Sequence, residues 1–233
     1  MRVHRFYVGS RSPREVQHFG SERMWIQDES LRHQLQNVLR LRVGENVDIF
    51  NDEVSFLYQI TDIKEKEIAL KKVTEIVRKM SKGHLLAWSL LKKDNNDLVL
   101  QKGTEIGISK FVPIISKRTE KETFDGERAL RIVVEAAEQC GRSDIPEITE
   151  VVSLEDAITA FKHSYRLLVA STHGGGHIDN KTPTGVFIGP EGGWTPEELA
   201  SFETEEIPGI RLSDFTLRAE TASIIAASKI NGV

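Results

Sequence analysis

The stretch GVFIGPEGGWTPEELASF, residues 185–202, places an apolar run, a glycine-rich turn and a helix start directly after one another. Residues 185–188 are typical of a buried strand, and the glycines that follow permit a sharp turn and close approach to bare backbone. Thr195 then predicts a helix N-cap, with Pro196 at the first helical position and Glu198 placed for a capping box. The stretch therefore predicts a strand, a turn and a helix, the unit from which open α/β sheets are built.

The turn itself limits the class of ligand, because ligands of open α/β sheets bind at the carboxyl ends of strands. Phosphate fits poorly, since the chain has no P-loop and no G-x-G-x-x-G pattern, and Glu191 would repel an anion. No serine stands between the glycines, so the turn is not a nucleophile elbow. Two interpretations remain: a neutral or cationic ligand that contacts backbone groups, and a well-capped turn that binds nothing.

A second irregular connection precedes the last helix, in RLSDFTLRAETASIIAASKI, residues 211–230. It predicts a short strand that ends near Leu212, then a bridge, then a helix that Glu220 opens. The helix dipole favours a carboxylate there by about 0.3–1 kcal/mol, so charge matching alone explains Glu220. The same dipole disfavours a cation, and Arg218 therefore indicates a partner outside the helix.

The remaining periodicity predicts two domains, a small β-rich domain over residues 1–74 and an α/β domain over residues 75–233. In the first, one helix with Asp28 or Ser30 as cap and Gly44 just past its end interrupts the strand-like segments 3–8, 46–50, 55–63 and 66–73. In the second, strands and helices alternate, which predicts a mostly parallel sheet with helices on both faces. Its strand-like segments are 84–91, 110–115, 165–171 and 184–188, and its further helices are 95–106 with an asparagine cap, 126–140, 153–161 and 220–230.

Composition excludes several classes of protein. The 233 residues are 39% hydrophobic and 28% charged, as in ordinary globular proteins, and no apolar run approaches the length of a membrane span. The charged N-terminus is unlike a secretory signal. Cys140 is the single cysteine, which excludes an intrachain disulfide, and the histidines lack ligand spacing, so we expect no metal site. A cytoplasmic location fits these features.

Charge is distributed unevenly along the chain. Residues 1–93 carry 17 Lys and Arg against 12 Asp and Glu, and the first eight basic residues are all arginine. Guanidinium groups suit planar, bidentate partners such as phosphate. An RNA-facing front half and an ordinary solvated surface are both consistent with this pattern. Further polar residues stand near the ends of helices, where they are placed to meet a partner. Lys102 and Glu105 can instead pair with each other, and Gln139 and Arg142 lie on either side of the helix end at Gly141.

Four segments, in this order, resemble the RsmE family: QKGTEIGISKFVPI (101–114), EAAEQCGRSDIPEI (135–148), FIGPEGGWTPEE (187–198) and TLRAETA (216–222). RFYV (5–8) and HQLQNVLRLRVGENVDIF (33–50) resemble the small PUA-like β-barrel domain of that family. Gly103 departs from the alanine expected in the first segment, and Ile106 and Ala219 are further departures. None of the three removes a side chain that could do chemistry.

The resemblance implies an S-adenosylmethionine-dependent methyltransferase that acts on N3 of a uridine in small-subunit (16S) ribosomal RNA. It also implies a SPOUT-type α/β domain with a trefoil knot, and a homodimer. The implied cofactor contacts are Ile188, Gly189, Pro190, Glu191, Gly192, Gly193, Leu212 and Leu217.

By the same resemblance and the chemistry of the acceptor, Arg218 is expected to stabilise negative charge on the uracil oxygens. Glu220, or failing that Glu191, is expected to orient Arg218 or accept the N3 proton. The expected RNA contacts are Arg2, Arg5, Arg11, Arg40, Lys102, Glu105, Gln139 and Arg142. The alternatives are a related knotted methyltransferase with another RNA target and a non-catalytic ribosome-assembly factor.

Overall fold

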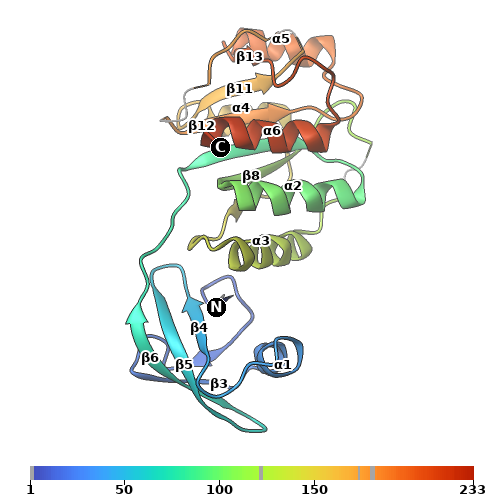
Figure 1. The fold of residues 1–233 in the computed structure, drawn as a ribbon. Coiled ribbons are helices and arrows are strands. Elements are labelled where there is room, and N and C mark those ends of the chain that lie inside the picture. Colours follow the sequence, from blue (N-terminus) through green and yellow to red (C-terminus); the bar gives the residue numbers. More distant parts are fainter. Residues whose placement is uncertain (1–2, 121–122, 173, 179–181) are drawn as a thin grey trace. The chain divides into compact units, whose positions relative to one another are not determined.

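The computed structural model describes residues 3–120, 123–172, 174–178 and 182–233, and the chain forms two compact units (Figure 1). Unit 1 comprises residues 1–80 and 137–144, and unit 2 comprises residues 81–136 and 145–233. None of the helices in the described ranges combines the length and apolar character needed to cross a bilayer.

Unit 1 is built on a six-stranded sheet with the strand order β1-β4-β5-β6-β3-β2. Its pairs are antiparallel except for β1 with β4, which is parallel. One face of the sheet carries the core, in which Phe6, Met24 and Tyr58 are fully or almost fully buried. The predicted strands at 3–8, 46–50, 55–63 and 66–73 are confirmed, whereas β2 and β3 were not predicted. The strands are β1 (His4–Tyr7), β2 (Val16–Gln17), β3 (Arg23–Ile26), β4 (Asn46–Phe50), β5 (Ser55–Ile63) and β6 (Ile68–Glu75).

The helix of unit 1 is shorter than predicted. Helix α1 (Glu29–His33) continues into one π-helical segment, η1 (Gln34–Val38). Of the two predicted caps, Asp28 is the one used, because its carboxylate accepts a hydrogen bond from the Leu31 N–H at 2.7 Å. The prediction that the helix runs to Gly44 was wrong, since the chain leaves the helical conformation at Arg40, whose φ is +54°.

Unit 2 holds a seven-stranded sheet with the order β10-β8-β7-β12-β11-β13, in which β9 also pairs with β8. All its strand pairs are parallel, so the predicted parallel sheet is confirmed. The strands are β7 (His84–Ser89), β8 (Ile108–Ile115), β9 (Glu147–Ile148), β10 (Val152–Ser153), β11 (Arg166–Ala170), β12 (Thr184–Ile188) and β13 (Gly209–Ile210). The helices are α2 (Lys93–Ile106), α3 (Gly126–Cys140, whose last four residues belong to unit 1), α4 (Leu154–Phe161), α5 (Pro196–Thr204) and α6 (Ala219–Asn231).

Helices cover both faces of this sheet, as the alternating pattern predicted. Alternate residues of β7 point to opposite faces. Leu85 and Ala87 pack in one core cluster with Ala157 of α4 and Phe202 of α5. Helices α2 and α6 lie side by side across the other face, where α6 contacts β7 and β12 and α2 contacts β8 (Figure 1).

Gly103, the residue expected to be alanine, lies inside helix α2, where glycine is less favourable than alanine by about 1 kcal/mol. A Cβ atom at this position would lie 2.7 Å from the Phe111 ring of strand β8. The Phe111 ring therefore occupies the space of the missing methyl group, and the glycine is explained by packing.

The start of helix α2 also differs from the prediction of an asparagine cap, because Lys92 is the N-cap residue. Asn96 is buried and ties the helix to the end of β7. Its Oδ1 accepts hydrogen bonds from Trp88 Nε1 at 2.9 Å and Leu91 N at 3.0 Å, and its Nδ2 donates to Leu91 O at 2.8 Å. The side chain satisfies three buried polar groups that have no solvent access.

We expect Asn96→Ala to lower the free energy of unfolding by about 2–4 kcal/mol, because each buried group left without a partner costs about 1–3 kcal/mol. Urea unfolding followed by tryptophan fluorescence measures this loss. Asn37→Ala, at an exposed asparagine, is the control and should change stability by less than about 0.5 kcal/mol. Equal losses in the two variants would contradict the role of Asn96.

Candidate active site

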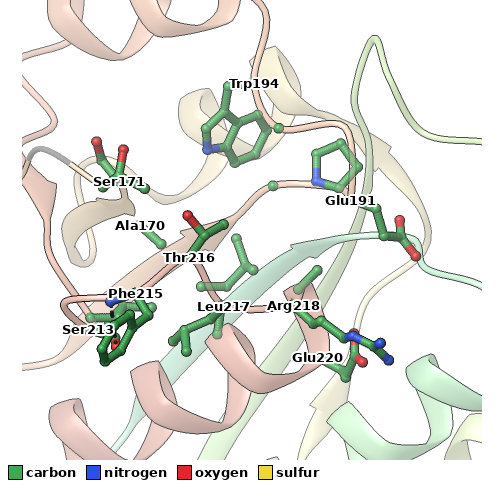
Figure 2. A pocket seen from close by; sticks show the side chains of 18 of the residues that line it. Ala170, Ser171, Glu191, Trp194, Ser213, Phe215, Thr216, Leu217, Arg218 and Glu220 are labelled. Atoms are coloured by element: carbon green, nitrogen blue, oxygen red, sulfur yellow. Dashed lines mark hydrogen bonds between the residues drawn. The ribbon is translucent and has the colours of Figure 1, made fainter.

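A cavity of about 630 Å³ lies at the carboxyl ends of β11 and β12 and beside the start of α6 (Figure 2). Three segments form most of its wall: the end of β11, the turn after β12 and the connection before α6. This is the edge of a parallel sheet at which ligands bind. The lining residues are Lys92, Asn95, 170–172, 188–191, Gly193, Trp194, Leu212, Ser213, 215–220 and Ala222.

The turn after β12 is tight and uses its glycines in different ways. The Gly193 N–H donates to Pro190 O at 2.9 Å, and Gly193 has a φ of +69°, which L side chains rarely adopt. Gly189 is needed for a different reason. A Cβ atom there would come within 3.0 Å of the Trp194 ring, so the indole packs directly on the backbone.

The predicted capping box of α5 is confirmed. Glu198 N donates to Thr195 Oγ1 at 3.2 Å, and Thr195 N donates to Glu198 Oε2 at 2.8 Å. Glu198 is buried, and its other oxygen, Oε1, accepts from Lys117 N at 2.8 Å. One carboxylate thus fixes the helix start and the segment that follows β8.

Arg118, in the same segment, holds the glycine turn from outside the cavity. Its Nη1 donates to Gly192 O at 2.8 Å and to Trp194 O at 3.3 Å. Sequence reasoning missed this residue, because the contact spans 74 and 76 positions and no local pattern indicates it.

The connection before α6 forms the opposite wall and has its own internal bonds. The Arg211 and Asp214 side chains form an ion pair at 3.1 Å, and Phe215 N donates to Ser213 Oγ at 3.1 Å. Phe215 also lines the cavity, although its residue surface is 82% exposed. An exposed aromatic residue within the polar run RLSDFT was a signal for this residue that the sequence prediction did not use.

The three predicted catalytic residues all line the cavity. Arg218 is the N-cap residue of α6 and is exposed, whereas Glu220 in the first turn is buried. Figure 2 shows Glu191, Arg218 and Glu220 at one end of the cavity and Ser171, Ser213 and Phe215 at the other. Within the described residues, Arg218 and Glu220 form no ion pair, so the Arg218 guanidinium is not held by the Glu220 carboxylate.

The structure also brings together the predicted cofactor contacts. Seven of the eight line the cavity, and the exception is Gly192, whose carbonyl accepts from Arg118. The wall is mainly backbone and apolar side chains, with Glu191 as the charged residue of the glycine turn. No three His, Cys, Asp or Glu side chains of the described ranges come together as a metal site.

The predicted RNA contacts that the structure describes are not among the residues that line this cavity. Lys102 Nζ and Glu105 Oε1 pair at 2.9 Å, which is the internal pairing left open above. Gln139 and Arg40 are exposed. Arg2 lies outside the described residues.

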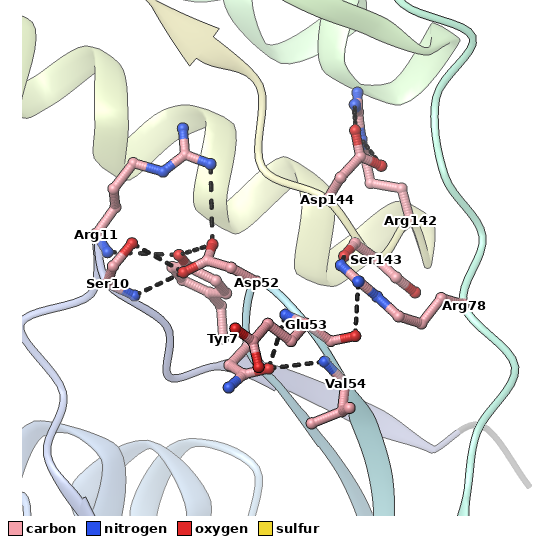
Figure 3. A network of polar contacts seen from close by, with 11 residues as sticks. Tyr7, Ser10, Arg11, Asp52, Glu53, Val54, Arg78, Arg142, Ser143 and Asp144 are labelled. Carbon is pink, nitrogen blue, oxygen red and sulfur yellow. Dashed lines mark hydrogen bonds and ion pairs between the residues drawn. The ribbon is translucent and has the colours of Figure 1, made fainter.

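Three predicted arginines belong to a polar network of unit 1. The Arg5 side chain is 11% exposed, pairs with Asp48 at 2.5 Å and donates to Arg142 O at 2.8 Å. The Arg142 side chain is 8% exposed and pairs with Asp144. Figure 3 shows Arg142 and Asp144 in this network. Both guanidinium groups therefore have internal partners.

Arg11 contacts Asp52 at 4.0 Å and is more exposed than Arg5 or Arg142 (Figure 3). Asp52 also accepts hydrogen bonds from the Tyr7 hydroxyl at 2.5 Å and from Ser10 N at 2.8 Å. Burial acts to raise the pKa of Asp52, but these hydrogen bonds and the charge of Arg11 outweigh it and hold the pKa below its ordinary value. Asp52 is therefore an ionised anchor for the segment that carries Arg11.

Comparison with known proteins agrees with this geometry. A family model described as RNA methyltransferase domain matches residues 79–231, and one described as RNA methyltransferase PUA domain matches residues 26–73. Ribosomal RNA small subunit methyltransferase E of Helicobacter pylori (strain 26695) is 31% identical over 87% of this chain and 92% of its own. The protein of that name from Rickettsia conorii is 28% identical over 99% of this chain and 96% of its own.

A solved structure is similar as well. Ribosomal RNA small subunit methyltransferase E from Neisseria gonorrhoeae, bound to S-adenosyl methionine, superposes with a TM-score of 0.82 at 26% identity, covering 97% of this chain and 95% of that one. The matches span both units of the chain, including the glycine turn and the connection before α6. The chain therefore belongs to the RsmE family of RNA methyltransferases, as its four ordered segments predicted.

Proposed function

We propose that the protein transfers the methyl group of S-adenosylmethionine to N3 of a uridine in 16S ribosomal RNA. The observation that carries the proposal is the cavity formed by the glycine turn and the connection before α6. It lies within the region that the methyltransferase family model matches. The related Neisseria protein, 26% identical, was solved with S-adenosyl methionine bound.

The cavity fits this cofactor in size and in chemistry. Small-molecule sites are about 300–1,000 Å³ and are mostly apolar with a few placed polar groups. Leu212, Leu217 and Ile188 offer apolar contact for adenine, and neighbouring backbone N–H and C=O groups can bond its edge. The glycine turn bears Glu191 and no basic residue, which suits a sulfonium better than a phosphate. When bound, the cofactor supplies an electrophilic methyl group.

The acceptor requires assistance, because uridine N3 carries a proton and is a poor nucleophile. We propose that Arg218, at the end of the cavity where Glu191 and Glu220 lie, stabilises the negative charge that develops on the uracil oxygens. Glu220 is the first candidate for accepting the N3 proton, and Glu191 is the second. The new bond joins N3 to the methyl carbon as the carbon–sulfur bond breaks. The target base must leave its stack to reach this site.

The solvent exposure of each side chain decides which of the predicted residues we keep as RNA contacts. Arg11, Arg40 and Gln139 retain accessible surface and stay in the proposal, as does Arg2. Arg5 and Arg142 are largely buried against internal partners, so we assign them to the stability of unit 1 instead. Lys102 and Glu105 pair with each other on helix α2, and we propose that they shape its surface.

The resemblance adds a homodimer and a trefoil knot in the α/β domain to the proposal. The sequence pattern adds a domain boundary near residue 75, and the composition favours action in the cytoplasm. A dimer is testable by sedimentation, and the modified nucleoside by mass spectrometry of 16S ribosomal RNA from cells that lack the protein. Loss of one methyluridine signal supports the proposed reaction, and an unchanged set of modified nucleosides contradicts it.

We expect Arg218→Ala to lower turnover on uridine-containing ribosomal RNA by about 10²–10³-fold, the usual effect of losing one charge-stabilising donor. Cofactor affinity, measured by calorimetry, should stay within about threefold, because the backbone contacts persist. Arg131→Ala removes a 63% exposed guanidinium on α3 and is the matched control. Turnover equal to that of the control would exclude Arg218 from the mechanism.

We expect Arg118→Ala to weaken S-adenosylmethionine binding by about 5- to 10-fold, since a charged donor contributes about 1.5–3 kcal/mol and this one is partly exposed. Arg118→Lys should recover part of the affinity through a single hydrogen bond. The melting temperature should change little, because the turn and not the core is affected. Undiminished affinity in the alanine variant would show that the capping box alone holds the turn.

A further inference from the structure

One transverse row of the unit 1 sheet is polar across four neighbouring strands. Arg23 of β3 lies opposite Lys71 of β6, Lys71 lies opposite Gln59 of β5, and Gln59 lies opposite Asn46 of β4. All four residues are exposed. Neighbouring strands are about 4.8 Å apart, so this transverse row spans about 14 Å of the outer face.

The transverse row contains a local electrostatic conflict. Like charges directly opposite each other on a sheet are destabilising, and Arg23 and Lys71 are such a pair. Within the described residues, neither side chain has an ion pair. Other cations of unit 1, such as Arg5, Arg14 and Lys64, do pair with carboxylates. The charge of Arg23 and Lys71 is therefore available to an anion from outside the molecule.

Aromatic surface adjoins the cationic end of the transverse row. Trp25 follows Arg23 at the next position on the same face of β3 and is half-buried. The ring centroids of Trp25 and His18 are 5.6 Å apart, with an interplanar angle of 77°. A hollow beside them is lined by His18, Ser21, Glu22, Arg23 and Trp25. Cations next to an aromatic side chain that keeps accessible surface are the combination that holds unpaired nucleotides.

We propose that this outer face of unit 1 binds a single-stranded segment of the substrate RNA. Arg23 and Lys71 contact successive phosphates, and one base stacks on Trp25. Gln59 and Asn46 offer amide donors and acceptors to sugars and bases farther along the row. The inference rests on the proposed function in naming RNA as the partner, but it assigns a surface separate from the methyl-transfer cavity.

Substitution of Glu22 should change RNA affinity in the opposite direction to substitution of Arg23 or Lys71. Glu22 is the carboxylate among the residues lining the hollow, and it repels phosphate. Glu22→Gln should therefore tighten RNA binding by about two- to threefold, whereas removal of the cations weakens it. A general loss of folding cannot produce effects in both directions.

The main experiment measures binding of full-length protein to in vitro-transcribed 16S ribosomal RNA over a range of salt concentrations. We expect Arg23→Ala with Lys71→Ala to weaken binding about 10-fold and to flatten the salt slope by about 1.4, since each phosphate contact on a single strand contributes about 0.7. Lys64→Ala with Lys66→Ala removes the same charge from the β5–β6 turn and is the control. Trp25→Ala should weaken binding, and Trp25→Phe should preserve it.

Folding is checked independently. Removing the like-charge pair should leave the melting temperature unchanged or raised, and cofactor affinity should stay the same. The assignment is overturned if the Arg23 and Lys71 double variant matches wild type, or if the Lys64 and Lys66 control loses as much affinity. Failure of the proposed function looks different, because the wild-type protein would then transfer no methyl group to the RNA.

Discussion

The buried carboxylate of Glu198 is the interaction on which the active-site turn depends. One of its oxygens closes the capping box of α5 and the other binds the backbone that follows β8. Burial of a polar carboxyl group is unfavourable unless hydrogen bonds replace its water, and here backbone N–H groups do so. Arg118 adds two bonds to carbonyls of the same turn. These bonds hold the second half of the turn, from Gly192 to Thr195, in place.

The parallel sheet explains why two distant segments build one cavity. Strand β11 pairs with β12 on one side and with β13 on the other, so the chain leaves three adjacent strands at the same edge. The glycine turn follows β12, and the connection to α6 follows β13. Asn96 fixes the start of α2 at that edge as well, which brings Lys92 and Asn95 into the wall.

Local patterns were sufficient to predict the parts of the site that local physics determines. The capping box, the strand before the glycine turn and the start of α6 could all be found from residue types and spacing. Arg118 could not, because its partners are set by the crossing of two loops. The prediction of an asparagine cap for α2 was wrong, because Lys92 is the N-cap and Asn96 instead bonds buried groups of Trp88 in β7 and of Leu91 just after it. Strand β2 escaped prediction because two residues carry no periodicity, and β3 escaped because its residues, RMWI, do not alternate between polar and apolar types.

Three expectations came from resemblance and not from spacing: the cofactor, the acceptor atom and the knot. It also led to Arg5 and Arg142 being grouped with the RNA contacts, although the structure surrounds both with internal partners. The exposed row from Arg23 to Asn46 is a feature that neither resemblance nor local sequence pattern predicted. Its residues are unremarkable one by one, and only strand register places them side by side.

Two glycines of the turn, Gly189 and Gly193, should show different patterns of substitution among descendants of this protein. Gly189 is constrained by the Trp194 ring, so a smaller residue at 194 would release position 189, and the two positions should vary together among descendants. Gly193 is constrained by its own backbone angle, with nothing within 4 Å of a Cβ atom. That angle disfavours most side chains whatever their neighbours, so lineages that keep the turn should favour glycine, or a residue such as asparagine that tolerates positive φ, at position 193.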